Sequence, residues 1–250
     1  MNAESTSETA VPEQAQARHG APGAFFWILM VFSLLAVGGL SLLKYLQTDR
    51  DRLRQIAAEQ REPLPVIAEI PDFTLTERSG QEVGLDDLRG RVWVADFIFT
   101  QCAGPCPIMS IRMKEFQDIL KKERMDDVAC VSITVDPERD TPARLREYAD
   151  ALGAETGRWL FLTGPNRKIR ELAIKGFKIA VQDPEQGDDQ IIHSTRFVLV
   201  DQKGQIRGYY SAMTEEEELD PSTAGSEQGL PAEARSRLLT DIRRLRRGDD

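Results

Sequence analysis

The residues best suited to chemistry are two cysteines, Cys102 and Cys106, separated by three residues. They stand between an apolar run over 91–99, which predicts a buried strand, and a pattern that predicts a helix. Pro107 suits the first helical position, so Cys106 is expected at a helix N-terminus, where the helix dipole favours a thiolate. A thiolate is both a nucleophile and a metal ligand. The sequence therefore predicts thiol–disulfide exchange, metal binding or both at this turn.

The three-residue spacer between these cysteines bears on the choice. It opens the loop relative to the two-residue spacer of a Cys-x-x-Cys redox motif, which suits two sulfurs sharing a metal and still permits a disulfide. A purely structural disulfide is the less favoured interpretation, because so short a loop gains little stability from a cross-link.

A third candidate ligand is His193, which directly precedes an apolar run that predicts a strand over 194–200. We expect this strand to pair near the one that leads to Cys102, so His193 could meet both thiolates at one sheet edge. Two thiolates and one imidazole suit copper, Cu(I) in particular, and can also hold Cu(II). The alternative is a surface histidine without a role.

Other reactive side chains have simpler interpretations. Cys130 lies within an apolar strand pattern and is expected in the core, as are Met109 and Met113 at helical spacing. Asp136 and Asp140 follow the predicted strand that contains Cys130, at the sheet edge where the two thiols are expected. They are candidates for groups that orient the metal ligands, and capping or turn chemistry is the alternative.

The remaining chain contributes a tail, an anchor and a stalk. Net charge is −9 over 250 residues, which argues against nucleic acid as a partner. Residues 1–23 are polar and predict a disordered tail. Residues 24–43 carry no charge and are long enough to predict a single transmembrane helix. A cleaved signal peptide is less favoured because no small-residue cleavage site follows. Residues 44–64 predict a charged helical stalk ended by prolines.

The charges flanking the predicted anchor bear on its orientation. Arg18 precedes it, whereas Lys44, Arg50, Arg52 and Arg54 follow it. The positive-inside rule alone would therefore leave the main domain in the cytoplasm.

Residues 65–211 predict one α/β domain. A hairpin over 70–85 precedes strands that alternate with helices, and a second hairpin ends the domain, a pattern typical of a mixed sheet with flanking helices. The predicted strands cover 92–99, 128–135, 159–163, 194–200 and 205–211, and the predicted helices cover 107–122, 142–152, 166–175 and 231–247. Residues 212–250 predict an acidic loop followed by a basic C-terminal helix.

Several motifs in this order resemble the Sco/SenC family of membrane-anchored, thioredoxin-like copper proteins that assist cytochrome c oxidase assembly. The resemblance covers about 67–211 and rests on these runs: Pro71-Asp72-Phe73-Thr74-Leu75, Asp87-Leu88-Arg89-Gly90, Phe99-Thr100-x-Cys102-x-x-x-Cys106-Pro107, Val135-Asp136-Pro137-Glu138-Arg139-Asp140-Thr141, and His193 before its strand.

The resemblance implies a thioredoxin-like fold in which Cys102, Cys106 and His193 bind one copper ion. It also implies a domain on the periplasmic side of a membrane or in the mitochondrial intermembrane space, which conflicts with the flanking charges. Ala103 stands where the family usually has proline, a departure that removes no ligand.

Two functions of different classes follow. The leading hypothesis is a copper metallochaperone that takes copper from a donor protein and delivers it to a cytochrome c oxidase subunit. The alternative is a thiol–disulfide oxidoreductase that uses Cys102 and Cys106 as a redox-active pair, for instance on the oxidase copper-site cysteines. Residues 190–195 contain no proline of the kind that faces the cysteines of thioredoxin-like enzymes, which favours metal. A peroxiredoxin-like peroxidase fits less well, because Thr100 lies only two residues before Cys102.

Overall fold

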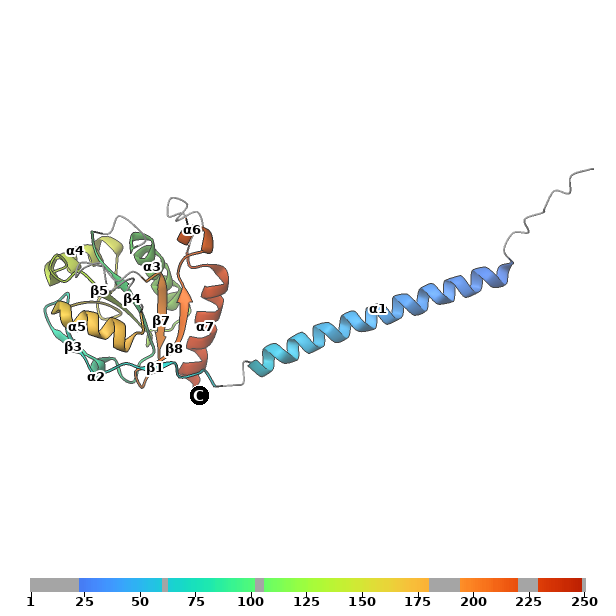
Figure 1. Ribbon diagram of the computed structural model, residues 1–250, viewed down its shortest axis with the longest axis horizontal. Coiled ribbons are helices and arrows are strands. Elements are labelled where there is room, and N and C mark those ends of the chain that lie inside the picture. Colours follow the sequence, from blue (N-terminus) through green and yellow to red (C-terminus); the bar gives the residue numbers. More distant parts are fainter. Residues whose placement is uncertain (1–22, 60–62, 102–105, 180–193, 220–228, 249–250) are drawn as a thin grey trace, which may run out of the picture. The chain divides into compact units, whose positions relative to one another are not determined.

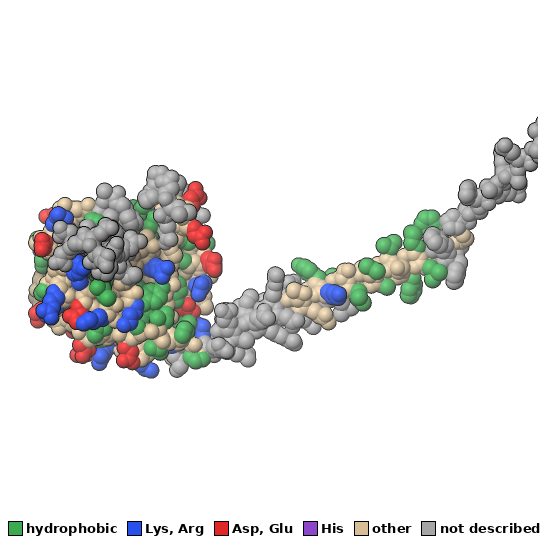
Figure 2. Space-filling view, in the orientation of Figure 1, with side chains coloured by type: hydrophobic (Ala, Val, Ile, Leu, Met, Phe, Trp, Pro, Cys, Tyr) green, Lys and Arg blue, Asp and Glu red, His purple; other side chains and the backbone are tan. Residues whose placement is uncertain are grey.

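The computed structural model describes residues 23–59, 63–101, 106–179, 194–219 and 229–248. The chain divides into two compact units, residues 1–61 and 62–250. In the first unit, the predicted anchor and most of the predicted stalk form one helix, α1 (Ala24–Glu59). Large apolar side chains of α1 between Trp27 and Tyr45 are exposed (Figure 2).

Within the described residues, no helix is both long enough and apolar enough to cross a membrane.

The second unit is built around one sheet with the strand order β1-β8-β7-β4-β5-β6-β2-β3 (Figure 1). The central strands β4, β5 and β6 are parallel, whereas β7 runs antiparallel to β4, and β8 runs antiparallel to β7. The strands are β1 (Ala68–Glu69), β2 (Thr74–Glu77), β3 (Glu82–Gly84), β4 (Trp93–Ile98), β5 (Ala129–Thr134), β6 (Trp159–Thr163), β7 (Arg196–Val200) and β8 (Gln205–Ser211). This is the predicted thioredoxin-like α/β fold with a mixed sheet.

Helices cover both faces of the sheet, so its central strands are buried on both sides and are apolar almost throughout. Val94 and Ile98 of β4 face α3, whereas Trp93 and Phe97 pack with Phe177 on the opposite face. The helices of this unit are α2 (Leu85–Leu88), α3 (Cys106–Lys122), α4 (Pro142–Leu152), α5 (Asn166–Glu171), the π-helix η1 (Leu172–Gly176), α6 (Glu215–Leu219) and α7 (Ala232–Arg247).

Local signals set several boundaries where they were predicted. The Thr141 hydroxyl accepts a hydrogen bond from the backbone N–H of Arg144 and caps α4, and Pro142 begins that helix. Gly153 ends it with a φ of 69°, a left-handed conformation that glycine adopts without strain. The first hairpin is also present as β2 and β3.

Three local features differ from the sequence-based expectation. The helix predicted over 166–175 changes to a π-helix at Leu172, and such irregular turns cannot be read from apolar periodicity. Strand β1 pairs with β8, and its two residues are too few to produce an alternating pattern. The segment predicted as an acidic loop begins as α6.

The C-terminal helix α7 belongs to the core of the second unit. It buries Leu238, Leu239, Ile242 and Leu245 in the same apolar cluster as the side chains of α3. Two arginines of α7 pair with acids that follow α3: Arg243 with Glu123, and Arg246 with Asp127. These ion pairs account for part of the basic character that the sequence assigns to this helix.

Candidate thiol and metal site

The candidate site lies at the sheet edge where β4 and β5 end. Cys106 is the first residue of α3, as predicted, and only 6 % of it is exposed. The other two predicted copper ligands, Cys102 and His193, lie outside the described residues. Among the residues that are described, no group of three His, Cys, Asp or Glu side chains is arranged to hold a metal ion.

Strand pairing brings the beginning of β7 to this edge. Ala95 of β4 lies opposite Val198 of β7 in the antiparallel ladder, so Arg196, which begins β7, lies toward the end of β4. His193 precedes Arg196 by three residues in the sequence, and Cys106 follows Ile98, the last residue of β4, by eight. The topology therefore directs the two chain segments that carry the candidate ligands to one edge of the sheet.

The buried carboxylate of Asp140 organises the chain just before Cys102. It accepts hydrogen bonds from the Thr100 hydroxyl (2.6 Å), from the Thr100 backbone N–H (3.1 Å), and from the Thr134 hydroxyl at the end of β5. Asp140 is fully buried, and a buried polar group needs hydrogen-bond partners to offset its lost hydration. The aspartate thus ties the segment that enters the cysteine loop to the end of the neighbouring strand.

The other predicted acidic residue, Asp136, has a different environment. Its carboxylate pairs with the exposed side chain of Arg139 at 2.9 Å, and its backbone N–H donates to the Thr134 hydroxyl. Arg144 instead reaches Thr100, with 3.2 Å between its Nε and the Thr100 hydroxyl oxygen. Of the two predicted aspartates, only Asp140 therefore contacts the chain that leads to Cys102 through a described hydrogen bond.

A second buried carboxyl, Asp96, lies within β4. The Ser132 hydroxyl of β5 donates to Asp96 Oδ1 at 2.6 Å, and Trp159 Nε1 of β6 donates to that same hydroxyl at 2.9 Å. Asp96 Oδ2 is buried without a hydrogen-bond partner within the described part of the chain. Burial raises the pKa of Asp96 to about 7, because the charged form loses its hydration there.

The simpler sequence-based interpretations are confirmed for the sulfur-containing residues of the core. Cys130 is fully buried in β5, and burial raises the pKa of its thiol, so the reactive thiolate is disfavoured. Met109 and Met113 pack in the apolar cluster beneath α3. All three residues are buried among apolar side chains, as expected for core residues.

Two charged residues near the site were missed by the sequence analysis. Arg112 and Glu217 form a buried ion pair between α3 and α6. Arg112 offers a signal in retrospect, since it falls at i+3 from Met109 on the apolar face of a predicted helix and therefore needs an acidic partner. Glu217 offers none, because it lies within a run of four glutamates.

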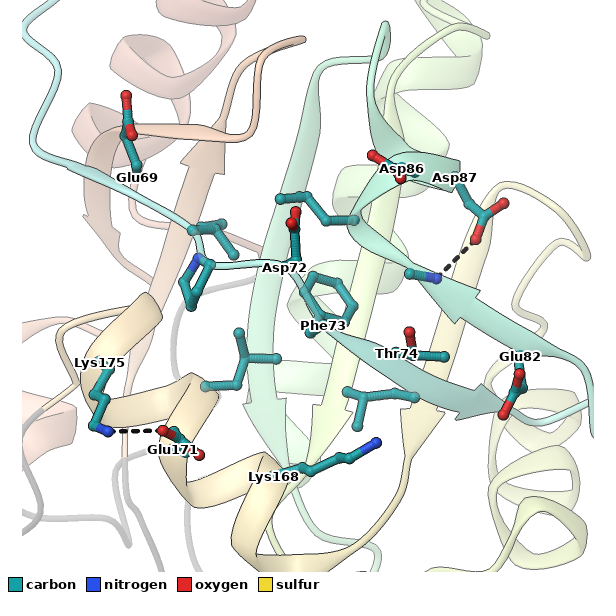
Figure 3. A pocket seen from close by; sticks show the side chains of 16 residues that line it. Glu69, Asp72, Phe73, Thr74, Glu82, Asp86, Asp87, Lys168, Glu171 and Lys175 are labelled. Atoms are coloured by element: carbon teal, nitrogen blue, oxygen red, sulfur yellow. Dashed lines mark hydrogen bonds and ion pairs between the residues drawn. The ribbon is translucent and has the colours of Figure 1, made fainter.

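A groove of about 1070 Å³ lies elsewhere in the domain, between α5–η1 on one side and α2–β3 on the other (Figure 3). Carboxylates outnumber ammonium groups among its side chains, which include Asp72, Asp86 and Glu171, with Lys168 and Lys175 on the wall formed by α5 and η1. None of the described residues that line the groove is a cysteine or a histidine.

Comparisons with known proteins identify relatives of this domain. The SCO1/SenC family model matches residues 62–224. A SCO1 protein homolog from Bacillus subtilis (strain 168) is 41 % identical over 150 residues, which cover 60 % of this chain and 77 % of the relative. A relative from Stutzerimonas stutzeri, whose name gives copper binding as a provisional assignment, is 30 % identical over 60 % of this chain and 72 % of its own.

A solved structure extends these matches to the fold. BsSco, described as a member of the Sco family of cytochrome c oxidase assembly proteins with a disulfide switch, is 34 % identical to this chain. The similarity covers 73 % of this chain and 96 % of that one, with a TM-score of 0.57.

Proposed function

Since the chain belongs to the SCO1/SenC family, we propose that it is a copper chaperone for a cytochrome c oxidase copper centre. It binds one copper ion as cargo through the thiolates of Cys102 and Cys106 and the imidazole of His193, and passes it to an oxidase subunit. Two soft sulfurs and one nitrogen suit copper. An S₂N donor set also leaves coordination positions for ligands of a donor or acceptor protein.

The observation that carries the proposal is the position of Cys106. Cys106 begins α3 at the sheet edge where β4 ends. Strand β7 begins at that same edge with Arg196, which follows His193 by three residues in the sequence. The positive end of the helix dipole favours the thiolate that copper requires. A relative with a provisional copper-binding name and a solved Sco-family oxidase assembly protein support the same cargo and destination.

Copper titration of the full chain, reduced and purified in detergent, tests the proposal. We expect one copper per chain, and loss of tight binding in Cys102→Ala, Cys106→Ala and His193→Ala, measured by competition with a chelator. The chain supplies matched controls: His19→Ala removes the only other histidine, and Cys130→Ala removes the only other cysteine. Both controls should bind copper as the wild type does. Binding that survives His193→Ala would overturn the proposed ligand set.

A redox role for the same cysteine pair is the second candidate. It is favoured by the disulfide switch in the description of BsSco, and a Cys102–Cys106 disulfide would block copper binding because the metal needs both thiolates. A chain that binds no copper when reduced, yet reduces a model disulfide with equal rates in wild type and His193→Ala, would establish the oxidoreductase in place of the chaperone.

The proposal places the copper-binding domain outside the cytoplasm, either on the periplasmic side of a membrane or in the mitochondrial intermembrane space. Residues 24–43 are its proposed anchor. The run of uncharged residues supports the anchor, whereas the flanking basic residues oppose this orientation. Alkaline phosphatase fused after Asp250 tests it, since the enzyme becomes active only after export. An inactive but intact fusion would place the domain in the cytoplasm.

A further inference from the structure

Arg112 is a buried charge on the helix that Cys106 begins. It follows Cys106 by six residues, which is less than two helical turns, and faces the sheet together with Met109 and Met113. Its guanidinium forms a two-pronged ion pair with Glu217, with Nη1–Oε2 at 2.9 Å and Nη2–Oε1 at 2.7 Å. The side chains are only 2 % and 1 % exposed. Two planar groups paired in this way have little freedom to rotate.

Glu217 is held from its own side as well. The Thr214 backbone N–H donates to Glu217 Oε2 at 2.9 Å, and the Glu217 backbone N–H donates to the Thr214 hydroxyl at 3.2 Å. These reciprocal bonds form a capping box at the start of α6. The carboxylate is therefore fixed both to α3 and to the chain that follows β8.

Ala212 connects this ion pair to the chain that leads into β7. Arg112 Nη1 also donates to the backbone carbonyl of Ala212, and the Ala212 N–H donates to the carbonyl of Thr195 at 2.8 Å. Thr195 is separated from His193 by Ser194 alone. A continuous set of hydrogen bonds thus joins the helix of Cys106 to the chain that follows His193.

From these contacts we infer that the Arg112–Glu217 pair and Ala212 form a brace that sets the spacing between the thiol helix and the beginning of β7. The inference rests on the proposed copper function, because it assigns these residues a role in the geometry of that site. Arg112 and Glu217 act through the chain segments that they hold together, so we assign them as positioning residues.

The physical reason is the behaviour of buried charge. A buried ion pair adds little net stability compared with apolar residues of similar volume, because both ions lose hydration. A half-broken pair is strongly unfavourable, so the two partners strongly favour the arrangement in which they meet. The brace therefore discriminates against displacement of α3 relative to β7, and such displacement would separate a thiolate from the imidazole.

The test compares substitutions in two buried ion pairs, the Arg112–Glu217 pair of the brace and the Arg207–Asp201 pair at the other end of β7 and β8. The double variant Arg112→Met with Glu217→Leu removes both charges of the brace and retains apolar volume, and Glu217→Gln is a milder change. Arg207→Met is the matched control: Arg207 pairs with Asp201 at 2.7 Å with both side chains buried, near the β7–β8 turn at the other end of these strands. Folding of each full-chain variant is verified by circular dichroism and its Tm.

The main readouts are copper affinity and the thiolate-to-Cu(II) absorption and EPR spectra of the loaded protein. We expect about 10–100-fold weaker copper binding and altered spectra in the brace variants, as for other changes to groups that orient metal ligands. Arg207→Met should lower the Tm and leave the spectra unchanged. Wild-type affinity and spectra in folded brace variants would overturn the inference.

A readout without copper separates failure of the brace from failure of the proposed function. The reduction potential of the Cys102–Cys106 pair depends on the relative positions of the thiols, and it can be measured in glutathione buffers. We expect the potential to shift in the brace variants and to stay constant in Arg207→Met. If the wild type binds no copper, a shifted potential would still support the brace, and an unshifted one would contradict it.

Discussion

The thiol edge of the domain and the acidic groove place their charges in opposite environments. At the thiol edge, Asp140, Arg112 and Glu217 are all buried, and each is held by two or more hydrogen bonds. In the groove, Lys175 and Glu171 form an ion pair with side chains 70 % and 50 % exposed (Figure 3). A buried charge is tolerated only with its partners in place, whereas an exposed pair exchanges partners with water at little cost.

The difference shows where geometry is constrained. Charges at the thiol edge are coupled to particular backbone positions, namely Thr100 before Cys102 and Ala212 beside Thr195. Among the charges that line the groove, Asp87 accepts a hydrogen bond from the Gly84 backbone N–H at an exposed helix start, whereas Lys175 and Glu171 pair with each other through exposed side chains. We therefore expect substitutions at the thiol edge to affect folding and site geometry together, and substitutions in the groove to affect neither strongly.

The largest effect is expected for Asp140→Ala. It leaves the Thr100 N–H and two threonine hydroxyls without their acceptor, and we expect the free energy of unfolding to fall by about 3–5 kcal/mol. Urea unfolding measures this, with Asp136→Ala as the control, because the ion pair described for the Asp136 carboxylate is with the exposed Arg139. Similar losses in the two variants would contradict the special status of the buried carboxylate.

Asp96 is expected to make stability depend on pH. Its pKa rises from 3.8 to about 7 on folding, so the folded chain holds a proton that the unfolded chain releases between these values. Stability should therefore fall as the pH rises from about 4 to about 7, by a few kcal/mol in total. Asp96→Asn should remove this component and be more stable than the wild type at pH 8.

Parallel urea titrations at pH 5 and pH 8 provide the measurement for Asp96. The difference between the two pH values should shrink in Asp96→Asn relative to the wild type. An unchanged difference would mean that other groups control this part of the pH profile.

The smallest effect is expected in the groove. Lys175→Met removes an exposed i,i+4 ion pair with Glu171, and we expect the free energy of unfolding to change by no more than about 0.5 kcal/mol. The change should also diminish in 1 M salt, which screens exposed charges. A loss as large as that of Asp140→Ala would erase the contrast between the two regions.

Much of the fold follows from local sequence. The apolar runs that predicted β4 to β7 are nearly continuous, because strands buried on both faces exclude polar residues almost completely. Strand β8 is more polar and was predicted as the hairpin partner of β7. Pro107 and Pro142 marked helix beginnings, and Gly153 marked a helix end. The π-helix η1 and strand β1 escaped prediction, because one depends on a local change of hydrogen bonding and the other on pairing with a strand more than a hundred residues away.

For the site, the sequence by itself determined the reactive groups: two thiols at a predicted strand-to-helix turn, one imidazole before a strand, and Asp140 after the next strand. The chemistry of these groups depends on their side chains and on their spacing along the chain, so it can be predicted from the sequence without knowledge of the fold. The copper ligand set remains a prediction, since Cys102 and His193 lie outside the described residues.

Only the tertiary structure decided which polar residues support that chemistry. It separated Asp140, which holds Thr100, from Asp136, which faces Arg139. It also selected Glu217 from a run of four glutamates as the partner of Arg112, 105 residues away along the chain. The physical reason is that a charge constrains the structure strongly only when it is buried and must keep its partners. Whether it is buried depends on how segments distant in the sequence pack together.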